Sequence, residues 1–74
     1  MDITQLKKNE RAKVVALEGG CGMVRKLEVM GITPGVEIVK TSSQFLGGPV
    51  ILSVRRTKVA VGHGMAKRII VEPL

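Results

Sequence analysis

The segment that decides the fold is Leu27-Glu28-Val29-Met30-Gly31-Ile32-Thr33-Pro34-Gly35. It predicts the last turn of a helix, a glycine stop and a tight turn into a strand. Gly31 stands where a helix C-terminal glycine is preferred, because glycine adopts a left-handed conformation without steric cost. Pro34 and Gly35 suit the two central positions of a β-turn. The segment therefore turns the chain from helix to strand.

The helix before this turn is predicted over residues 23–30. Apolar residues at helical spacing predict a face that packs on the core. The residues expected on that face are Val24, Leu27 and Met30, with Val29 as a further candidate. The residues expected in water are Arg25, Lys26 and Glu28.

Most of the remaining sequence is strand-like, with β-branched and alternating apolar residues between glycine-rich turns. Five short strands are predicted, at 13–17, 36–41, 50–55, 58–61 and 68–72. A single helical turn is expected at 65–67, before the last strand. Short strands joined by glycine turns favour a small closed or nearly closed barrel, which leaves few strand edges bare.

One connection departs from the usual turn chemistry. Arg56-Thr57, between the third and fourth strands, lacks the Asn-Gly or Asp-Gly that two-residue hairpin loops prefer. A looser turn or a shifted register is therefore expected there.

Length and composition limit the class of protein. The 74 residues are expected to form one domain, residues 1–74. Neither a signal peptide nor an apolar stretch near membrane-spanning length is found. The single cysteine, Cys21, cannot form an internal disulfide, which favours a reducing compartment, and we expect a cytoplasmic protein. The net charge of +6 fits an anionic partner or, alternatively, solubility alone.

The pattern resembles the ferrous iron transport protein A (FeoA) family in its free-standing, single-domain form. The resemblance is carried mainly by Arg25-x-Leu27-x-x-Met30-Gly31-Ile32-x-Pro34-Gly35. Leu6, Gly19-Gly20 and Gly47-Gly48-Pro49 before an alternating strand also fit. Together these matches cover about residues 4–72.

The resemblance implies a small β-barrel like the Src-homology-3 (SH3) domain. It also implies a cytosolic accessory or regulatory protein that binds the ferrous iron permease, a membrane protein with a cytosolic GTPase domain. Two features depart from the family pattern: Arg56-Thr57, where a glycine is expected, and Gly62-His63-Gly64, where charged residues are expected.

Neither a metal site nor an enzyme is expected. Cys21 and His63, with Met23 and Met65 as soft neighbours, are too few for a structural zinc site, which takes four protein ligands. The six acidic residues are spread out, and no phosphate-binding loop follows the glycines at 19–22. No cofactor is predicted.

A surface that binds the transporter is the favoured site. Phe45 and Leu46 would anchor a partner if exposed, or else would close one end of the barrel. Arg25, Arg55 and Arg56 could in principle supply an arginine to a partner's GTPase site, although solvated surface charges are the simpler interpretation. The residues predicted to bind the partner are Arg25, Lys26, Gly31, Thr33, Pro34, Phe45 and Leu46.

A small basic barrel suggests two other binding roles. Proline-peptide recognition is disfavoured, because such grooves are lined with aromatic residues and Phe45 is the only one here. The alternative function is a basic small β-barrel that binds nucleic acid non-specifically, since no aromatic platform for specific binding is present. Short edge strands would also allow a homo-oligomer.

Overall fold

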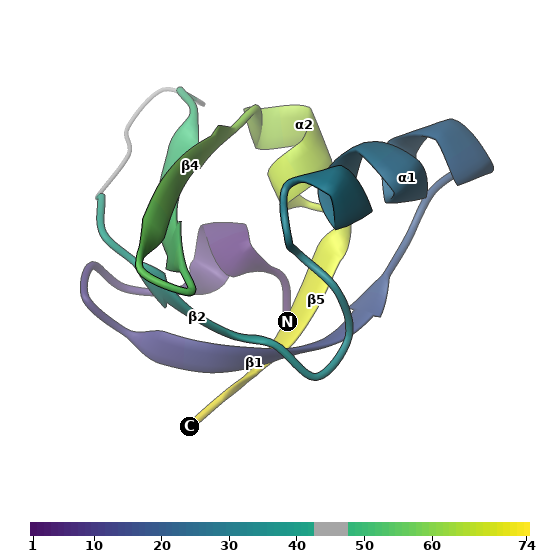
Figure 1. Ribbon diagram of the computed structural model, residues 1–74. Helices are drawn as coiled ribbons and strands as arrows, with labels where there is room; N and C mark the ends of the chain where they lie inside the picture. Colours follow the sequence, from purple (N-terminus) through teal and green to yellow (C-terminus); the bar gives the residue numbers. More distant parts are fainter. Residues whose placement is uncertain (43–47) are drawn as a thin grey trace.

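A single antiparallel sheet with strand order β4-β3-β2-β1-β5 forms the fold (Figure 1). The computed structural model describes residues 1–42 and 48–74. The elements in chain order are the 3₁₀-helix η1 (Ile3–Gln5), β1 (Arg11–Leu17), α1 (Cys21–Val29), β2 (Glu37–Lys40), β3 (Val50–Val54), β4 (Thr57–Val61), α2 (His63–Ala66) and β5 (Ile69–Pro73). The predicted five strands, the helix between the first two and the helical turn before the last are confirmed.

The sheet curls round into a nearly closed barrel, and β4 and β5 are its two edge strands (Figure 1). The chain's own start covers part of the β5 edge. Asp2 forms a β-bridge with Ile70, and the Val71 N–H donates to the carbonyl of Met1 at 2.8 Å. This pairing leaves less of the β5 edge open to another chain.

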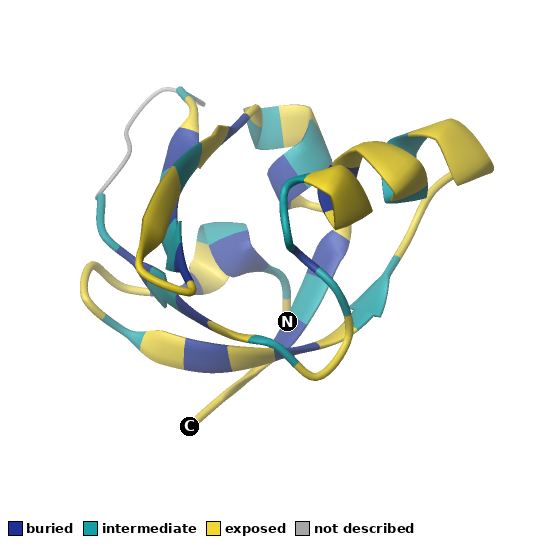
Figure 2. Cartoon of the chain, in the orientation of Figure 1, coloured by how far each residue is buried: buried dark blue, intermediate teal, exposed yellow. Residues whose placement is uncertain are grey.

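The core lies inside the curl and is built from alternate strand positions (Figure 2). Val50, Leu52 and Val54 point inward from β3, as the alternation predicts. Figure 2 shows the same alternation of buried and exposed residues along β1. Because the chain is small, this one apolar cluster supplies most of the hydrophobic stabilisation of the fold.

The end of α1 is fixed by a complete glycine-stop motif. The Ile32 N–H donates to the Leu27 carbonyl at 2.9 Å, and the Gly31 N–H donates to the Glu28 carbonyl at 2.9 Å. Gly31 is left-handed, with φ +86°. Leu27 and Ile32 are both fully buried, which supplies the apolar contact that accompanies this motif. At its other end α1 begins at Cys21, two residues earlier than predicted, with Gly20 as its N-cap.

The core-facing side of α1 differs from the prediction. Met23, Leu27 and Met30 contact the core, whereas Val29 is 82% exposed and Val24 is not part of the cluster. At 3.6 residues per turn, positions 23, 27 and 30 fall within a narrow arc, while 24, 27 and 30 spread over about a third of the circumference. The prediction for Val24 and Val29 was therefore wrong.

The turn after α1 is docked on the sheet. The Val36 N–H donates to the Thr33 carbonyl at 3.1 Å, and Gly35 has φ +94°. Pro34 and Gly35 thus occupy the centre of a type II turn, as predicted. The Gly35 N–H then donates to the Val14 carbonyl at 2.7 Å, and the Val14 N–H donates to the Val36 carbonyl at 2.9 Å. These bonds place β2 beside β1.

The β3–β4 connection corrects the prediction of a loose turn at Arg56-Thr57. Val54 pairs with Thr57, so the loop consists of the two residues Arg55 and Arg56. Both are left-handed, with φ 50° and 70°. This is the arrangement of a type I′ hairpin turn, for which Asn-Gly is preferred. Placing two arginines there costs roughly 1–2 kcal/mol for each residue.

Lys40 is a charged residue inside the barrel. It lies on the inward face of β2 with Ile38 and is only 5% exposed. Its ammonium donates to the Leu6 carbonyl at 2.8 Å and to the Thr4 carbonyl at 3.2 Å. The side chain thereby ties the N-terminal segment, including η1, to the sheet and satisfies carbonyls that η1 leaves unpaired.

We expect Gly31→Ala to lower the free energy of unfolding by roughly 1–2 kcal/mol, because alanine is strained at this positive φ. Urea denaturation would measure the change. Gly22→Ala is the matched control: Gly22 lies within α1, nothing lies within 4 Å of an added Cβ, and its φ is not positive. That control should stabilise the protein by about 0.5–1 kcal/mol. Equal effects of the two substitutions would contradict the structure.

Lys40→Met should keep most of the packing but remove the hydrogen bonds to the carbonyls of Thr4, in η1, and of Leu6, the residue after η1. Because buried carbonyls are then left unpaired, we expect a loss of about 1–3 kcal/mol and faster hydrogen exchange at Gln5 and Leu6. The same substitution at exposed Lys58 should change stability by less than about 0.5 kcal/mol. A neutral Lys40→Met would show that the ammonium contributes nothing.

Candidate functional site

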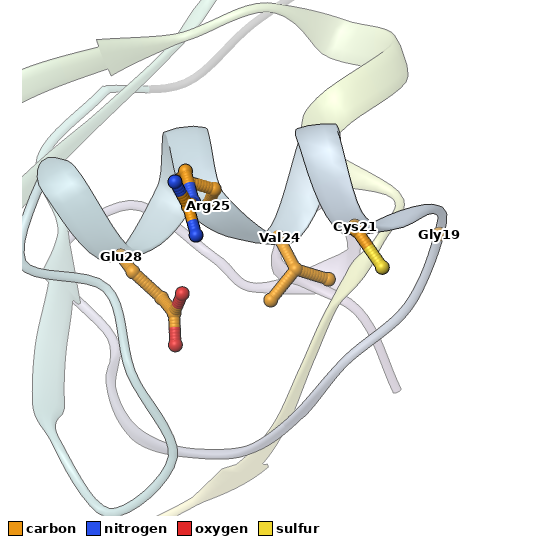
Figure 3. Close-up of a pocket in the computed structure, with 5 residues that line it drawn as sticks. All are labelled: Gly19, Cys21, Val24, Arg25 and Glu28. Carbon is orange, nitrogen blue, oxygen red and sulfur yellow. The ribbon is translucent and has the colours of Figure 1, made fainter.

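A groove of about 300 Å³ lies along the side of α1 that faces away from the core (Figure 3). It is open to solvent rather than enclosed. Figure 3 shows the side chains of Val24 and Glu28 directed into the space beside the helix. The residues that line the groove are Gly19, Cys21, Val24, Arg25 and Glu28.

The positions of the lining residues follow from helical geometry. Cys21, Val24, Arg25 and Glu28 have the spacing i, i+3, i+4, i+7, which places them on one helix face. Gly19 closes the groove at the start of α1. Its φ is +115°, and a Cβ there would lie 3.3 Å from Cγ of Met23, closer than nearly all real Cβ contacts. A glycine therefore suits this close approach of the loop to the helix.

The loop before α1 is held by the turn that precedes the last strand. The Glu18 N–H donates to the Arg68 carbonyl at 2.8 Å, which fixes the chain as it leaves β1. The N-terminal end of the groove is therefore anchored by a backbone hydrogen bond between residues that are far apart in the sequence.

The groove combines an apolar wall with charged rims. Val24 provides apolar surface between Cys21 and Arg25 (Figure 3), and the thiol of Cys21 is exposed. In the part of the chain that the structure describes, the one ion pair within 4.0 Å joins Arg11 to Glu37, at 2.9 Å. Arg25 and Glu28 can thus both contact a ligand. An apolar patch with a polar rim is typical of protein interfaces.

Residues 1–42 and 48–74 contain no cluster of three His, Cys, Asp or Glu side chains that could hold a metal ion. Cys21 begins α1 and His63 begins α2, so the two candidate metal ligands from the sequence lie on different helices. Within the same residues, no helix is long and apolar enough to cross a membrane.

The predicted partner-binding residues divide into three groups. Arg25 lines the groove, whereas Lys26 is exposed on α1 outside the groove. Gly31, Thr33 and Pro34 form the helix stop and the type II turn, where Pro34 is exposed. Phe45 and Leu46 lie outside the described residues. The structure therefore joins Arg25 to residues that the prediction did not select.

Two residues of α1 that line the groove were missed. Val24 was assigned to the core, and Cys21 was interpreted only as a metal ligand. Glu28 was expected with Arg25 and Lys26 on the exposed side of the helix that would contact a partner. The correct core set, Met23, Leu27 and Met30, leaves Cys21, Val24 and Glu28 on a second face. Helical spacing shows both candidate faces in the sequence, but only the packing decides which of them meets the core.

The fold defines the class: a small SH3-like β-domain with an open groove along its helix. Comparison with known sequences gives the family. The sequence matches the FeoA domain over residues 1–73, and the chain belongs to this family. FeoA is associated with ferrous iron transport, as the resemblance implied.

Individual relatives agree with this assignment. A protein of Methanocaldococcus jannaschii, assigned provisionally as Fe(2+) transport protein A, is 36% identical over 66 residues, which are 89% of this chain and 78% of the relative. The crystal structure of an iron uptake regulatory protein, FeoA, has a TM-score of 0.94 at 34% identity, covering 100% of this chain and 97% of the other.

A third relative supports the fold alone. The FeoA of Stenotrophomonas maltophilia, crystallised with zinc, has a TM-score of 0.82 at 24% identity and covers 97% of this chain and 89% of the other. It is described as a procaryotic SH3 domain protein. The SH3-like architecture predicted from the sequence is therefore confirmed.

Exposure of Cys21 at the groove predicts its accessibility. We expect a disulfide reagent such as Ellman's reagent to modify one thiol per chain in the absence of denaturant, because nothing covers the side chain. Titration of the urea-unfolded chain provides the reference stoichiometry. A thiol that reacts only after unfolding would contradict the groove as described.

Proposed function

We propose that this protein is a non-enzymatic accessory factor of ferrous iron transport that acts in the cytoplasm by binding the cytosolic part of the ferrous iron permease. The observation that carries the proposal is the groove on the outer face of α1, in a chain that belongs to the FeoA family. The groove has room for a side chain of a partner protein.

The names of the relatives support the same system. The protein of M. jannaschii is provisionally an Fe(2+) transport protein A, and the S. maltophilia structure is described as a suggested activating factor of ferrous iron transport. An accessory factor needs a surface for its transporter, and the groove supplies one.

The groove matches a protein ligand better than a small molecule. Its volume of about 300 Å³ lies at the lower limit of ligand pockets, and it is open to solvent. Val24 offers an apolar contact, while Arg25 can lay its methylene groups along that contact and keep its charge in water. A partner helix or loop that inserts one apolar side chain between charged groups fits this surface.

Val24→Lys should weaken binding to the purified cytosolic part of the permease by roughly tenfold or more, because a charge replaces the apolar wall. Isothermal titration calorimetry at physiological salt would measure the dissociation constant. Val29→Lys is the matched control, since Val29 is on the same helix but outside the groove and 82% exposed. Both variants should melt within a few degrees of the wild-type protein.

The proposal fails if the wild-type protein does not bind the permease domain. Equal weakening by the two variants would instead move the interface away from the groove. Recovery of RNA alone from a cell extract, in amounts that decrease as salt rises, would favour the basic nucleic-acid-binding barrel.

A further inference from the structure

The β3–β4 hairpin tip places two charged residues in an unusual backbone conformation. Arg55 and Arg56 are both exposed and both have positive φ, 50° and 70°. Glycine or asparagine would adopt this turn more easily. The local backbone thus disfavours the residues that the sequence places there.

Contacts within the fold do not account for these two arginines. In residues 1–42 and 48–74, neither guanidinium forms an ion pair or a hydrogen bond. Glu37 precedes Ile38, the register partner of Val54, so it lies on the strand beside the tip, but its carboxylate is engaged by Arg11. Residues that break a local preference without a compensating contact in the fold are typical of functional sites.

The tip lies close to the end of α1. A Cβ at Gly31 would be 3.7 Å from Cγ1 of Val54, and Val54 is the residue immediately before the tip. The turn that stops α1 and the start of the arginine loop are therefore neighbours.

The small extent of the basic cluster at the hairpin tip indicates what kind of partner it can bind. Lys67 and Arg68 follow α2, at the end of β4 remote from the tip (Figure 1), and at roughly 3.3 Å per strand residue β4 alone separates them by about 15 Å. Lys7 and Lys8 lie near the Lys40 end of β2, through the bond from the Asn9 N–H to the Lys40 carbonyl. Lys58, the second residue of β4, is exposed on the same hairpin and adds one charge near the tip. The tip is therefore a local cluster of three basic residues rather than part of a continuous basic track, which a nucleic acid would need.

We infer that Arg55 and Arg56 dock the protein onto a pair of carboxylates, from Asp or Glu side chains, on the cytosolic part of the permease. Each guanidinium presents a planar fork of N–H donors that matches a carboxylate in a bidentate arrangement. The two-residue turn holds both forks at the end of a paired hairpin. This inference rests on the proposed function and assigns a second, electrostatic contact at the hairpin tip.

The decisive variant is the double substitution Arg55→Asn, Arg56→Gly, which installs the residues that the turn prefers. It should raise the melting temperature and weaken binding to the purified cytosolic part of the permease at least tenfold at physiological salt. The salt dependence of binding should also become shallower, because charged contacts are lost. Opposite effects on folding and binding distinguish a docking element from a structural one.

Two further variants serve as controls. The double substitution Lys67→Gln, Arg68→Gln removes two positive charges at a site remote from the tip. It should leave the affinity for the permease domain within about twofold of the wild type. Arg55→Lys, Arg56→Lys keeps the charge but not the forks, and should still lose several-fold in affinity. If the Arg55→Asn, Arg56→Gly variant melted below the wild type, its weaker binding could reflect misfolding. The Arg55→Lys, Arg56→Lys variant would then test the arginine contact, because it keeps the charge of the turn.

The outcomes separate the two proposals. If the wild type binds the permease domain and the Asn-Gly variant binds equally well, the arginine contact is wrong and the proposed function stands. If the wild type does not bind, the proposed function fails and this inference fails with it. If the arginines prove necessary only for binding vesicles that contain phosphatidylglycerol, whose headgroup carries a phosphate and no carboxylate, the ligand is a lipid phosphate and the carboxylate assignment is overturned.

Discussion

The structure depends on how the chain leaves α1. Gly31 in the left-handed conformation allows two backbone bonds to close the helix, and it directs Ile32 back onto Leu27 in the core. Four residues later, Gly35 bonds to Val14 of the first strand. One short segment thus ends the helix, buries it against the sheet and begins the second strand beside the first. Without this reversal, β2 would have no fixed register on β1.

The same constraint gives α1 two faces with different tasks. The face with Met23, Leu27 and Met30 packs on the core, and the helix is held there at both ends. The opposite face of α1 is therefore fixed in position but does not pack on the core. A rigid element that presents a partly apolar, charge-rimmed groove is a suitable support for binding, because little order has to be created when a partner docks.

Some features could be read from the sequence because they are local. The glycine stop, the Pro34-Gly35 turn and the alternation of β3 each depend on residues a few positions apart, and each is confirmed. The features that were mistaken or missed depend on three-dimensional context. Val24 and Met23 are both apolar, and only the packed helix shows which one meets the core. Arg55 and Arg56 adopt a tight turn against their local preference, because the pairing of β3 with β4 fixes the register around them.

The sequence alone therefore determined the family, the fold class and the place where the chain reverses, since backbone conformation at glycine and proline and the period of apolar residues are short-range properties. The tertiary structure alone decided which side of α1 is open, that Lys40 lies inside the barrel bonded to the carbonyls of Thr4 and Leu6, and that two arginines share one hairpin tip. Those outcomes depend on contacts between residues far apart in the chain. At these positions, the role of a side chain depends on which residues the fold places next to it.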